Sequence, residues 1–471
     1  NEGVKESALG FLFVFQMDGK TLDSRKYTWQ EIRRHNTGTD CWIVIDGKVY
    51  DVSKWLKYHP GGVLPLLYSA GQDCSSVFKA FHPFSWTREK RLPPFYIGDV
   101  SEPHNEGVKE SVISSELDKI QEEIVKEGGY QTYYGFYLKN FLFQFTLLAI
   151  VFYLLSTTTS LPALLVAGVA MGLYFQQVAF IGHDAGHHLI THNQDTDEKI
   201  GFLVGNAVSG ISIGWWKRSH NAHHVVTNSV NCDPDIQHLP VFAITDKFFK
   251  PVMSTYHEKI FFFNKISKFF VSNQHLLYYV IMGVARFNLY LQSFIHVFTH
   301  EKGRRKKMEL ITLGIFWCWF SLLVSFIPTI SGRVIFVLVS HFIAGLLHVQ
   351  ITISHFSMAT YHGLPSNTYQ RDSFFISQMA TTMNVDCHPY LDFFHGGLQF
   401  QIEHHLFPRV SRPYLRVLSK KIQKLCKKQD VQYCTHSFYE ANKEVIGSLR
   451  ETARKAQCFS SFIWDGINAV G

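Results

Sequence analysis

Four long apolar runs constrain the fold of this chain more than any other feature of its sequence. They lie at about 138–155, 161–181, 310–327 and 334–356, and each is close to the roughly 20 residues with which an α-helix crosses a bilayer. Two further stretches, 200–216 and 276–298, are apolar but are interrupted by Gly, Arg, Asn or Gln. We predict four membrane-spanning helices with interfacial helices beside them. A fold with six spans is the competing prediction.

The basic residues of the chain lie mainly at the flanks of these runs. Five Lys or Arg residues lie between 302 and 307 and eight between 409 and 428, whereas the links at 156–160 and 328–333 carry none and one. Because positively charged loops stay in the cytosol, both termini and residues 182–309 are expected on the cytosolic side of the endoplasmic reticulum membrane. The net charge of +7 therefore points to lipid headgroups, and we expect no nucleic acid partner.

Composition divides the rest of the chain into further segments. Residues 27–101 alternate short apolar strands with polar turns, with Asp46 and Gly47 between two strands, and are expected to form a small soluble domain. Residues 102–135 are charged and helical in pattern and form a linker, 136–455 form the membrane domain, and 456–471 form a C-terminal tail. The first seven residues, NEGVKES, recur at 105–111, so 1–26 are interpreted as a disordered or non-native extension.

Two His-Pro pairs lie 23 residues apart in the small domain, at His59 within HPGG and at His82. Two imidazoles can bind both axial faces of a haem iron, which leaves no open position for oxygen and suits electron transfer. A Pro-Gly turn with two incidental histidines is the simpler alternative for HPGG alone. However, DCWIVIDGKVYDVSKWLKYHPGG and AFHP together resemble the cytochrome b5 family. The resemblance implies an α+β fold and haem b held by His59 and His82.

Three short histidine-rich sets lie beside apolar runs on the predicted cytosolic side. Within each set the spacing is i, i+3 or i, i+4, so the side chains of one set share a helix face and can converge on a metal. Imidazoles with few carboxylates suit iron, copper or zinc, and a polar helix end with surface histidines is the alternative for any single set. The three sets are His183 and His187; His220, His223 and His224; and Gln401, His404 and His405.

The residues around these sets resemble the membrane fatty acid desaturase superfamily over nearly all of 27–455. The similarity is carried by GISIGWW before HNAHH, by CDPDIQHLPVF and by FFHGGLQFQIEHHLFP. Gln401 at the start of the third set, with the cytochrome b5-like domain, is typical of front-end desaturases. The resemblance implies an all-α polytopic domain and two non-haem irons held by the histidines of the three sets, with Gln401 in the place of a histidine. It adds His355 as an extra ligand, although Ser354 stands where the family often has Asn.

Other residues near the sets are given different roles. His341 and His348 are expected to turn a polar face into the helix bundle. His188, His238 and His395 are interpreted as neighbours of the ligands or as surface residues. Carboxylates can orient imidazoles by accepting a hydrogen bond from the second ring nitrogen. The candidates for this role are Asp184, Asp233, Asp235 and Glu403.

The predicted reaction follows from the chemistry of an unactivated methylene group. Its C–H bond is beyond the reach of a side-chain base, so a metal centre that activates O2 must supply the oxidant. The resemblance implies a front-end desaturase that introduces a double bond into a lipid acyl chain. Electrons would come from the fused haem domain, reduced by an NADH-dependent cytochrome b5 reductase. A Δ8 desaturase of sphingolipid long-chain bases is the main alternative, and a lipid hydroxylase and a non-catalytic haem electron carrier are lesser ones.

Overall fold

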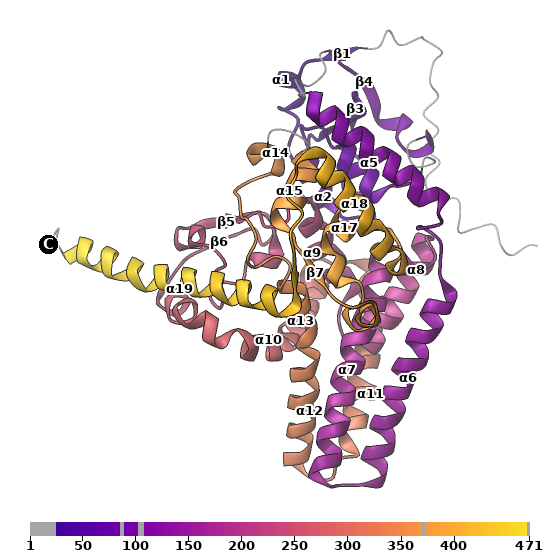
Figure 1. The fold of residues 1–471 in the computed structure, drawn as a ribbon, viewed down its shortest axis with the longest axis vertical. Helices are drawn as coiled ribbons and strands as arrows, with labels where there is room; N and C mark the ends of the chain where they lie inside the picture. The colour runs from indigo at the N-terminus through magenta and orange to yellow at the C-terminus, as the bar shows by residue number, and fades with distance from the viewer. Residues whose placement is uncertain (1–24, 85–88, 102–107, 370–372, 469–471) are drawn as a thin grey trace, which may run out of the picture.

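The computed structural model describes residues 25–84, 89–101, 108–369 and 373–468. Figure 1 shows an elongated molecule with a small mixed domain at one end, a bundle of long helices at the other, and a layer of short helices between them. Most of the N-terminal segment 1–26 lies outside the described residues, and the segment boundaries drawn from the sequence stay predictions.

The small N-terminal domain is built on a four-stranded sheet with the order β1-β4-β3-β2. β1 pairs with β4 in parallel, and the other neighbours are antiparallel. Asp46 and Gly47 form the predicted turn between β2 and β3, and both have the positive φ that a two-residue hairpin turn requires, 49° and 73°. The elements are β1 (Lys26–Tyr27), α1 (Trp29–Ile32), β2 (Trp42–Ile45), β3 (Lys48–Asp51), η1 (Leu56–Tyr58), α2 (Val63–Ser69), α3 (Ser75–Phe81), η2 (Pro93–Phe95) and β4 (Tyr96–Val100).

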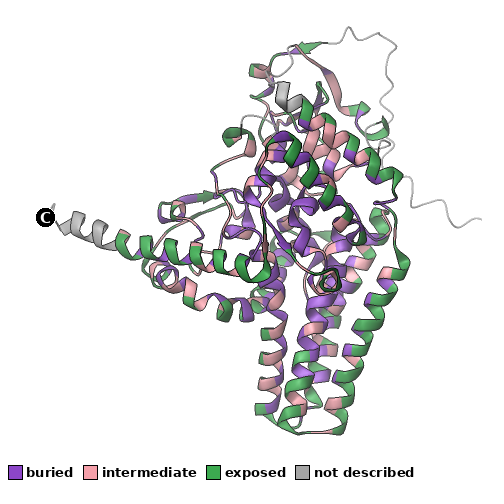
Figure 2. Ribbon diagram, viewed as in Figure 1, coloured by how far each residue is buried: buried purple, intermediate pink, exposed green. Residues whose placement is uncertain are grey.

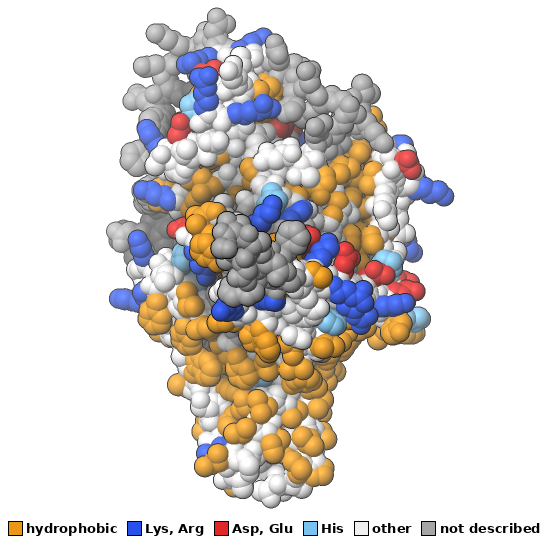
Figure 3. Space-filling model, turned by 90° about the vertical axis from the view of Figure 1, so that its left-hand side faces the viewer, with side chains coloured by type: hydrophobic (Ala, Val, Ile, Leu, Met, Phe, Trp, Pro, Cys, Tyr) orange, Lys and Arg blue, Asp and Glu red, His pale blue; other side chains and the backbone are white. Residues whose placement is uncertain are grey.

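Four candidate spans in the described residues are long and apolar enough to cross a membrane, as predicted. The links between α6 and α7 and between α11 and α12 lie at the far end of the bundle from the short helices (Figure 1). Side chains on the outer face of the bundle are largely exposed (Figure 2), and hydrophobic side chains cover this part of the molecule (Figure 3). The spans are α6 (Tyr134–Thr157), α7 (Leu161–Gly186), α11 (Gly303–Ser325), and α12 (Ile330–Ala344) continued by α13 (Leu346–Thr352).

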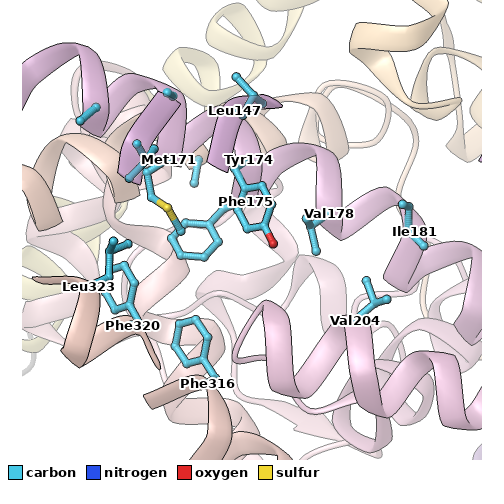
Figure 4. Close-up of a cluster of buried hydrophobic side chains, with 14 of the residues drawn as sticks. Leu147, Met171, Tyr174, Phe175, Val178, Ile181, Val204, Phe316, Phe320 and Leu323 are labelled. Carbon is cyan, nitrogen blue, oxygen red and sulfur yellow. The ribbon is translucent and has the colours of Figure 1, made fainter. Parts of the chain in front are cut away.

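The interior of the bundle is filled by aromatic and aliphatic side chains. Phe175 of α7 packs on Phe316 and Phe320 of α11, with ring centres 6.1 and 5.7 Å away, and all three rings are buried (Figure 4). α7 also approaches α12 closely, because a Cβ at Gly172 would lie only 2.5 Å from the Cβ of Ile343. This packing from two sides fixes α7, whose last turn carries the first histidine set.

Two long helices, α10 (Lys265–Thr299) and α19 (Phe438–Asn468), lie crosswise to the bundle and pack against each other (Figure 1). α10 contains the stretch 276–298 but is not one of the candidate spans, which favours four spans over six. The other described elements lie outside the four spans and the small domain. They are α5 (Val108–Lys126), α8 (Gln194–Gly201), the π-helix η3 (Phe202–Val208), α9 (Ile213–Val225), η4 (Pro234–Ile236), η5 (Asp246–Phe249), β5 (Val252–Ser254), β6 (Lys259–Phe261), α14 (Pro365–Thr368), α15 (Ser373–Thr381), β7 (Asn384–Asp386), η6 (Pro389–Leu391), α16 (Asp392–His395), η7 (Leu398–Phe400), α17 (Gln401–Leu406), η8 (Arg412–Tyr414), α18 (Leu415–Gln429) and β8 (Thr435–Ser437).

Helix α5, which lies in the predicted linker, packs along α18. Its apolar side shares one buried cluster with α18 and with Ala80 of α3 in the small domain. On the solvent side, Lys421 Nζ lies 2.7 Å from a carboxylate oxygen of Glu123 and 2.8 Å from one of Glu127. The small domain, the linker helix and the rest of the chain are therefore joined through a common core. The members of this cluster on α5 and α18 are Ile113, Ile120, Ile124, Leu415, Leu418, Ile422, Leu425 and Cys426.

Candidate metal centre and haem-binding site

The two predicted haem ligands face each other within the small domain. The ring centres of His59 and His82 are 6.4 Å apart, which suits one metal between them, since each metal–nitrogen bond is about 2 Å long and the two ring radii fill the rest. Nδ1 of His59 donates to the carbonyl oxygen of Gly62 at 2.7 Å, and Nδ1 of His82 donates to that of Phe78 at 3.0 Å. Each Nε2 is thus left for the metal. A Cβ at Gly61 would lie 2.8 Å from the His59 ring, so glycine leaves room for it.

Burial keeps both of these imidazoles neutral. It lowers the pKa of His59, and it lowers the pKa of His82 to about 4, with a smaller contribution from the charge that His59 would carry if protonated. Positive charges outside the small domain lower both values further, Lys217 for His59 and Arg409 for His82. A neutral imidazole is the form that binds a metal, so the pair fits the predicted haem.

The three histidine sets meet at one place in the larger part of the molecule. Seven histidines form two groups, and the candidate ligand atoms within each group lie within 4.8 Å of one another. His224 lies between the groups, with its ring centre 4.5 Å from that of His220 and 4.2 Å from that of His405. The first group is His183, His187, His220 and His404, and the second is His223, His355 and His405.

Four segments far apart in the sequence supply these side chains. His183 lies in the last turn of α7 and His187 caps it, while α9 carries the second set and α17 the third. His355 lies in the turn that follows α13, three residues after the helix ends. Gly396 makes the turn before α17 with a left-handed φ of 60°, and a Cβ there would lie 2.2 Å from the ring of Phe180. The glycine therefore lets this turn lie against α7, which brings the third set to the first.

Three of the histidines are oriented by a hydrogen bond at Nδ1, which leaves Nε2 for a metal. The partners differ: one is a carboxylate that the sequence predicts, one is a side-chain amide and one is a backbone carbonyl. The pairs are His223 with Asp233 (2.9 Å), His405 with Gln378 (2.9 Å) and His355 with the carbonyl oxygen of Thr381 (3.2 Å).

The centre contains many more imidazoles than carboxylates. Burial would lower the pKa of His223, but the charges of Asp233 and Asp235 raise it to about 9. Burial dominates at six rings, and the positive charge that a neighbouring ring would carry disfavours their protonation further: His187, His220, His224, His355, His404 and His405. Neutral rings have free lone pairs, so the cluster suits a cation. The pKa lies well below its usual value at His220, His224, His404 and His405.

The remaining predicted histidines lie apart from the two groups. His341 and His348 are buried in the bundle, as predicted, and His341 Nε2 lies 3.2 Å from the hydroxyl of Tyr290. Gln401 begins α17 one turn before His404 and is only 4% exposed, and its role as a ligand stays a prediction. Three other predicted histidines also belong to neither group: His188, His238 and His395.

The prediction of orienting carboxylates is wrong for three residues. Asp184 forms a buried ion pair with Arg412 at 2.7 Å and lies 3.8 Å from Nδ1 of His183, too far for a hydrogen bond. Glu403 accepts a hydrogen bond from Asn384 at 2.6 Å, and burial raises its pKa to about 7. Asp184 and Glu403 each adjoin a metal-group histidine in sequence, but successive side chains on a helix point in different directions. Asp235 lies 3.8 Å from Nδ1 of His223, also too far for a hydrogen bond.

Two contacts at the centre could not be derived from the sequence. Gln378, which orients His405, lies in α15 within a segment that matches no motif. Phe81 directly precedes the haem ligand His82, and its ring centre lies 5.9 Å from that of His224. The only signal for Phe81 is its place in the haem motif, because nothing in the sequence brings that motif to the metal histidines.

Comparison with known proteins finds family matches for both the small domain and the larger helical part of the chain. The Fatty acid desaturase family model matches residues 159–437, and the Cytochrome b5-like Heme/Steroid binding domain matches residues 28–101. The Delta(8)-fatty-acid desaturase of Helianthus annuus is 39% identical over 455 residues, 95% of this chain and 97% of that protein. The Delta 8-(E)-sphingolipid desaturase of Kluyveromyces lactis is 44% identical over 352 residues, 73% of this chain and 60% of that protein.

Two further proteins are similar to this chain, one over nearly its whole length and one over the small N-terminal domain. The Acyl-lipid (9-3)-desaturase of Borago officinalis is 38% identical over 95% of this chain and 99% of that protein. The solved cytochrome b5 of Ostreococcus tauri virus 2 is 36% identical, covering 16% of this chain and 95% of that chain with a TM-score of 0.15. Because the desaturase model covers more than half of the sequence and relatives match nearly its whole length, this chain belongs to the fatty acid desaturase family, as an oxidoreductase fused to its own cytochrome b5 domain.

Proposed function

We propose that this desaturase uses O2 and two iron ions to introduce a Δ8 double bond into a fatty acyl chain. The observation that carries the proposal is the pair of histidine groups, which His224 joins and which Phe81 of the cytochrome b5 domain reaches. The Δ8 position follows the Helianthus annuus relative, which aligns with 95% of this chain. Haem b would be held by His59 and His82.

Two histidine groups fit two metal ions, and the family indicates iron among the metals that imidazoles bind. When bound, the irons supply the O2 activation by which one hydrogen is removed from each of two neighbouring carbons. His224 would help to hold one of the two ions through a ring nitrogen, and Gln401 would complete the set. We assign one iron to His183, His187, His220 and His404, and the other to His223, His355 and His405.

The protein's own residues orient these ligands and exclude water. Asp233 accepts the Nδ1 hydrogen bond of His223, and Gln378 contacts Nδ1 of His405, so both rings are fixed before a metal binds. His224 and His405 are completely buried. Exclusion of bulk water at such a centre protects an oxidising reaction from side reactions.

The contact between the two domains supports electron transfer within one chain. The ring of Phe81 lies beside that of His224 and is adjacent in sequence to His82, so the haem ligand and the metal histidines are separated by one side chain. We propose that electrons pass along this contact. An NADH-dependent cytochrome b5 reductase would reduce the haem domain.

A desaturase of sphingolipid long-chain bases is the second candidate. It is favoured by the Kluyveromyces lactis relative, whose identity of 44% over 73% of this chain exceeds the 39% of the Helianthus annuus protein. Both relatives are named for the Δ8 position, so the two candidates differ in the lipid and share the position of the double bond.

The four apolar spans would cross the endoplasmic reticulum membrane, with the cytochrome b5 domain and the histidine groups on the cytosolic side. Their exposed outer faces are hydrophobic (Figure 3), and both links lie at the far end from the histidine groups. The basic flank at 302–307 adjoins the end of α11 that lies near the short helices. This orientation follows from the preference of basic residues for the cytosol.

The function is tested by expressing the chain in a yeast host that lacks endogenous front-end and sphingolipid desaturases. Fatty acyl chains and long-chain bases are then analysed separately by mass spectrometry. A new Δ8 double bond in acyl chains is the expected result. A double bond found only in long-chain bases selects the second candidate, and a hydroxylated product without desaturation contradicts both.

A further inference from the structure

Two cations of the desaturase domain, one buried and one partly buried, lie at its boundary with the cytochrome b5 domain. Lys217 of α9 is only 7% exposed. Arg409, which follows α17, is partly buried, and its Nε is buried without a hydrogen-bond partner in the described part of the chain. Neither residue belongs to the two histidine groups. They are therefore not accounted for by the proposed reaction.

Each cation lies beside one of the two loops that carry a haem ligand. Lys217 and Asn221 share one face of α9, and Asn221 Nδ2 donates to the carbonyl oxygen of Gly61 at 3.0 Å, two residues after His59. On the other side, the guanidinium carbon of Arg409 lies 5.3 Å from the ring centre of Phe84, two residues after His82. The two cations thus approach the two sides of the haem site.

One residue of the desaturase domain connects the cations. Lys217 Nζ lies 3.3 Å from Nε2 of His188, and Arg409 donates to the backbone carbonyl oxygen of His188 at 3.4 Å. His188 itself adopts a left-handed backbone, with φ of 58°, in the turn that follows α7. The two positive charges are therefore held together by a fixed turn.

No carboxylate balances these charges at ion-pair distance among the residues that the structure describes. By contrast, Arg305 nearby pairs with both Glu198 and Glu301. Burial lowers the pKa of Lys217 to about 8 and lowers the pKa of Arg409. Asp197 attracts both cations and Glu198 attracts Lys217, but only from beyond ion-pair distance. A cation withdrawn from solvent without a close ion pair is costly, so an anion that joins the folded protein is expected here.

We propose that Lys217 and Arg409 bind the two propionate carboxylates of the haem, so that this edge of the haem lies against the desaturase domain. A haem carries two such carboxylates, and the structure provides two cations, one beside each ligand loop. Charge-assisted hydrogen bonds of this kind are the strong ones in proteins. The proposal rests on haem binding by residues 28–101 and not on the lipid substrate or the reaction.

The first test measures haem loss from the full-length, haem-loaded protein into excess apomyoglobin. Lys217→Gln and Arg409→Gln should each accelerate haem loss by roughly tenfold or more, the equivalent of one hydrogen bond to a charged group. Both variants should also lower the midpoint potential of the haem, because a nearby positive charge favours the reduced form. Lys217→Arg, which keeps the charge, should lose haem more slowly than Lys217→Gln. Lys259→Gln, on the exposed β6 strand, removes an equal charge elsewhere and should change neither value.

The second test leaves the protein unaltered, because a variant that misfolds would also lose haem. The wild-type chain is loaded with haem dimethyl ester, whose propionates carry no charge, and is expected to lose it about as fast as the Lys217→Gln/Arg409→Gln double variant loses ordinary haem. The double variant should lose the dimethyl ester and ordinary haem at similar rates. Equal loss of the ester and of ordinary haem from the wild type would overturn the proposal, whatever the lipid activity shows.

Discussion

The proposed haem site and the proposed metal centre both bring histidines face to face, but the chain builds them in opposite ways. His59 and His82 lie in one small domain, 23 residues apart. The metal histidines come from α7, α9, α17 and the turn after α13, and they span residues 183–405. The first site depends on a local motif, whereas the second depends on how the bundle and the short helices pack. Damage to either site should therefore leave the other intact.

The largest expected effect is the loss of the metal centre alone. His404→Ala removes a side chain that lies in the first group, 3.1 Å from His183 between the two Nε2 atoms. We expect no detectable lipid product and loss of non-haem iron, with an unchanged haem spectrum. Iron analysis with lipid profiling measures this.

The exposed His388 offers a matched control for that variant. His388→Ala should keep both iron and activity. Full activity of His404→Ala would mean that the third histidine set does not hold a metal, and would remove the basis of the proposed function.

A variant at the haem site provides the complementary test. His59→Ala removes one of two facing imidazoles, so haem absorbance and activity supported by the reductase should both be lost. Non-haem iron should remain near the wild-type value, because no residue of the small domain belongs to either histidine group. A parallel loss of iron would show that the two sites fold as one unit.

An intermediate effect is expected from the residue that orients His223. Asp233→Asn weakens the hydrogen bond to Nδ1 and should lower metal affinity by about 10–100-fold, as is usual for such partners. Asp235→Asn is the matched comparison, because its carboxylate lies 3.8 Å from the same nitrogen and forms no hydrogen bond with it. Titration of apoprotein with ferrous iron under anaerobic conditions measures both. An equal loss of iron affinity in the two variants would show that Asp233 contributes through its charge and not by orienting His223.

The smallest effect should come from the contact between the sites. Phe81→Leu removes the ring that lies beside His224 and should slow oxidation of the reduced haem during turnover, without changing haem content or iron. Stopped-flow absorbance at the haem band measures this rate. Phe78→Leu removes a ring that stacks on His82 inside the small domain, and it should leave the rate closer to wild type. If Phe78→Leu slowed haem oxidation more than Phe81→Leu does, electrons would not pass through the contact between Phe81 and His224.

The same contrast explains how much could be predicted from the sequence. The pair His59 and His82, the Asp46-Gly47 turn and the four apolar helices are local patterns, and the structure matches them. The three histidine sets were identified by spacing, but only the packing of α7 against the turn at Gly396 brings the third set to the first. Gln378 and Arg409 have partners more than 25 residues away, so no local pattern could reveal their contacts. Asp184 and Glu403 were misassigned because adjacency on a helix was taken for contact.

The packing of α5 along α18 has a kinetic consequence. A flexible tether gives a donor domain a finite effective concentration that depends on tether length, whereas a packed helix fixes the separation of donor and acceptor. With a packed helix, electron transfer from the haem domain to the metal centre of the same chain should not depend on enzyme concentration. It should also be insensitive to free cytochrome b5 in the same membrane. Only the encounter with the reductase would then remain bimolecular, and supply of that protein, rather than of a shared electron carrier, would limit the enzyme in a cell.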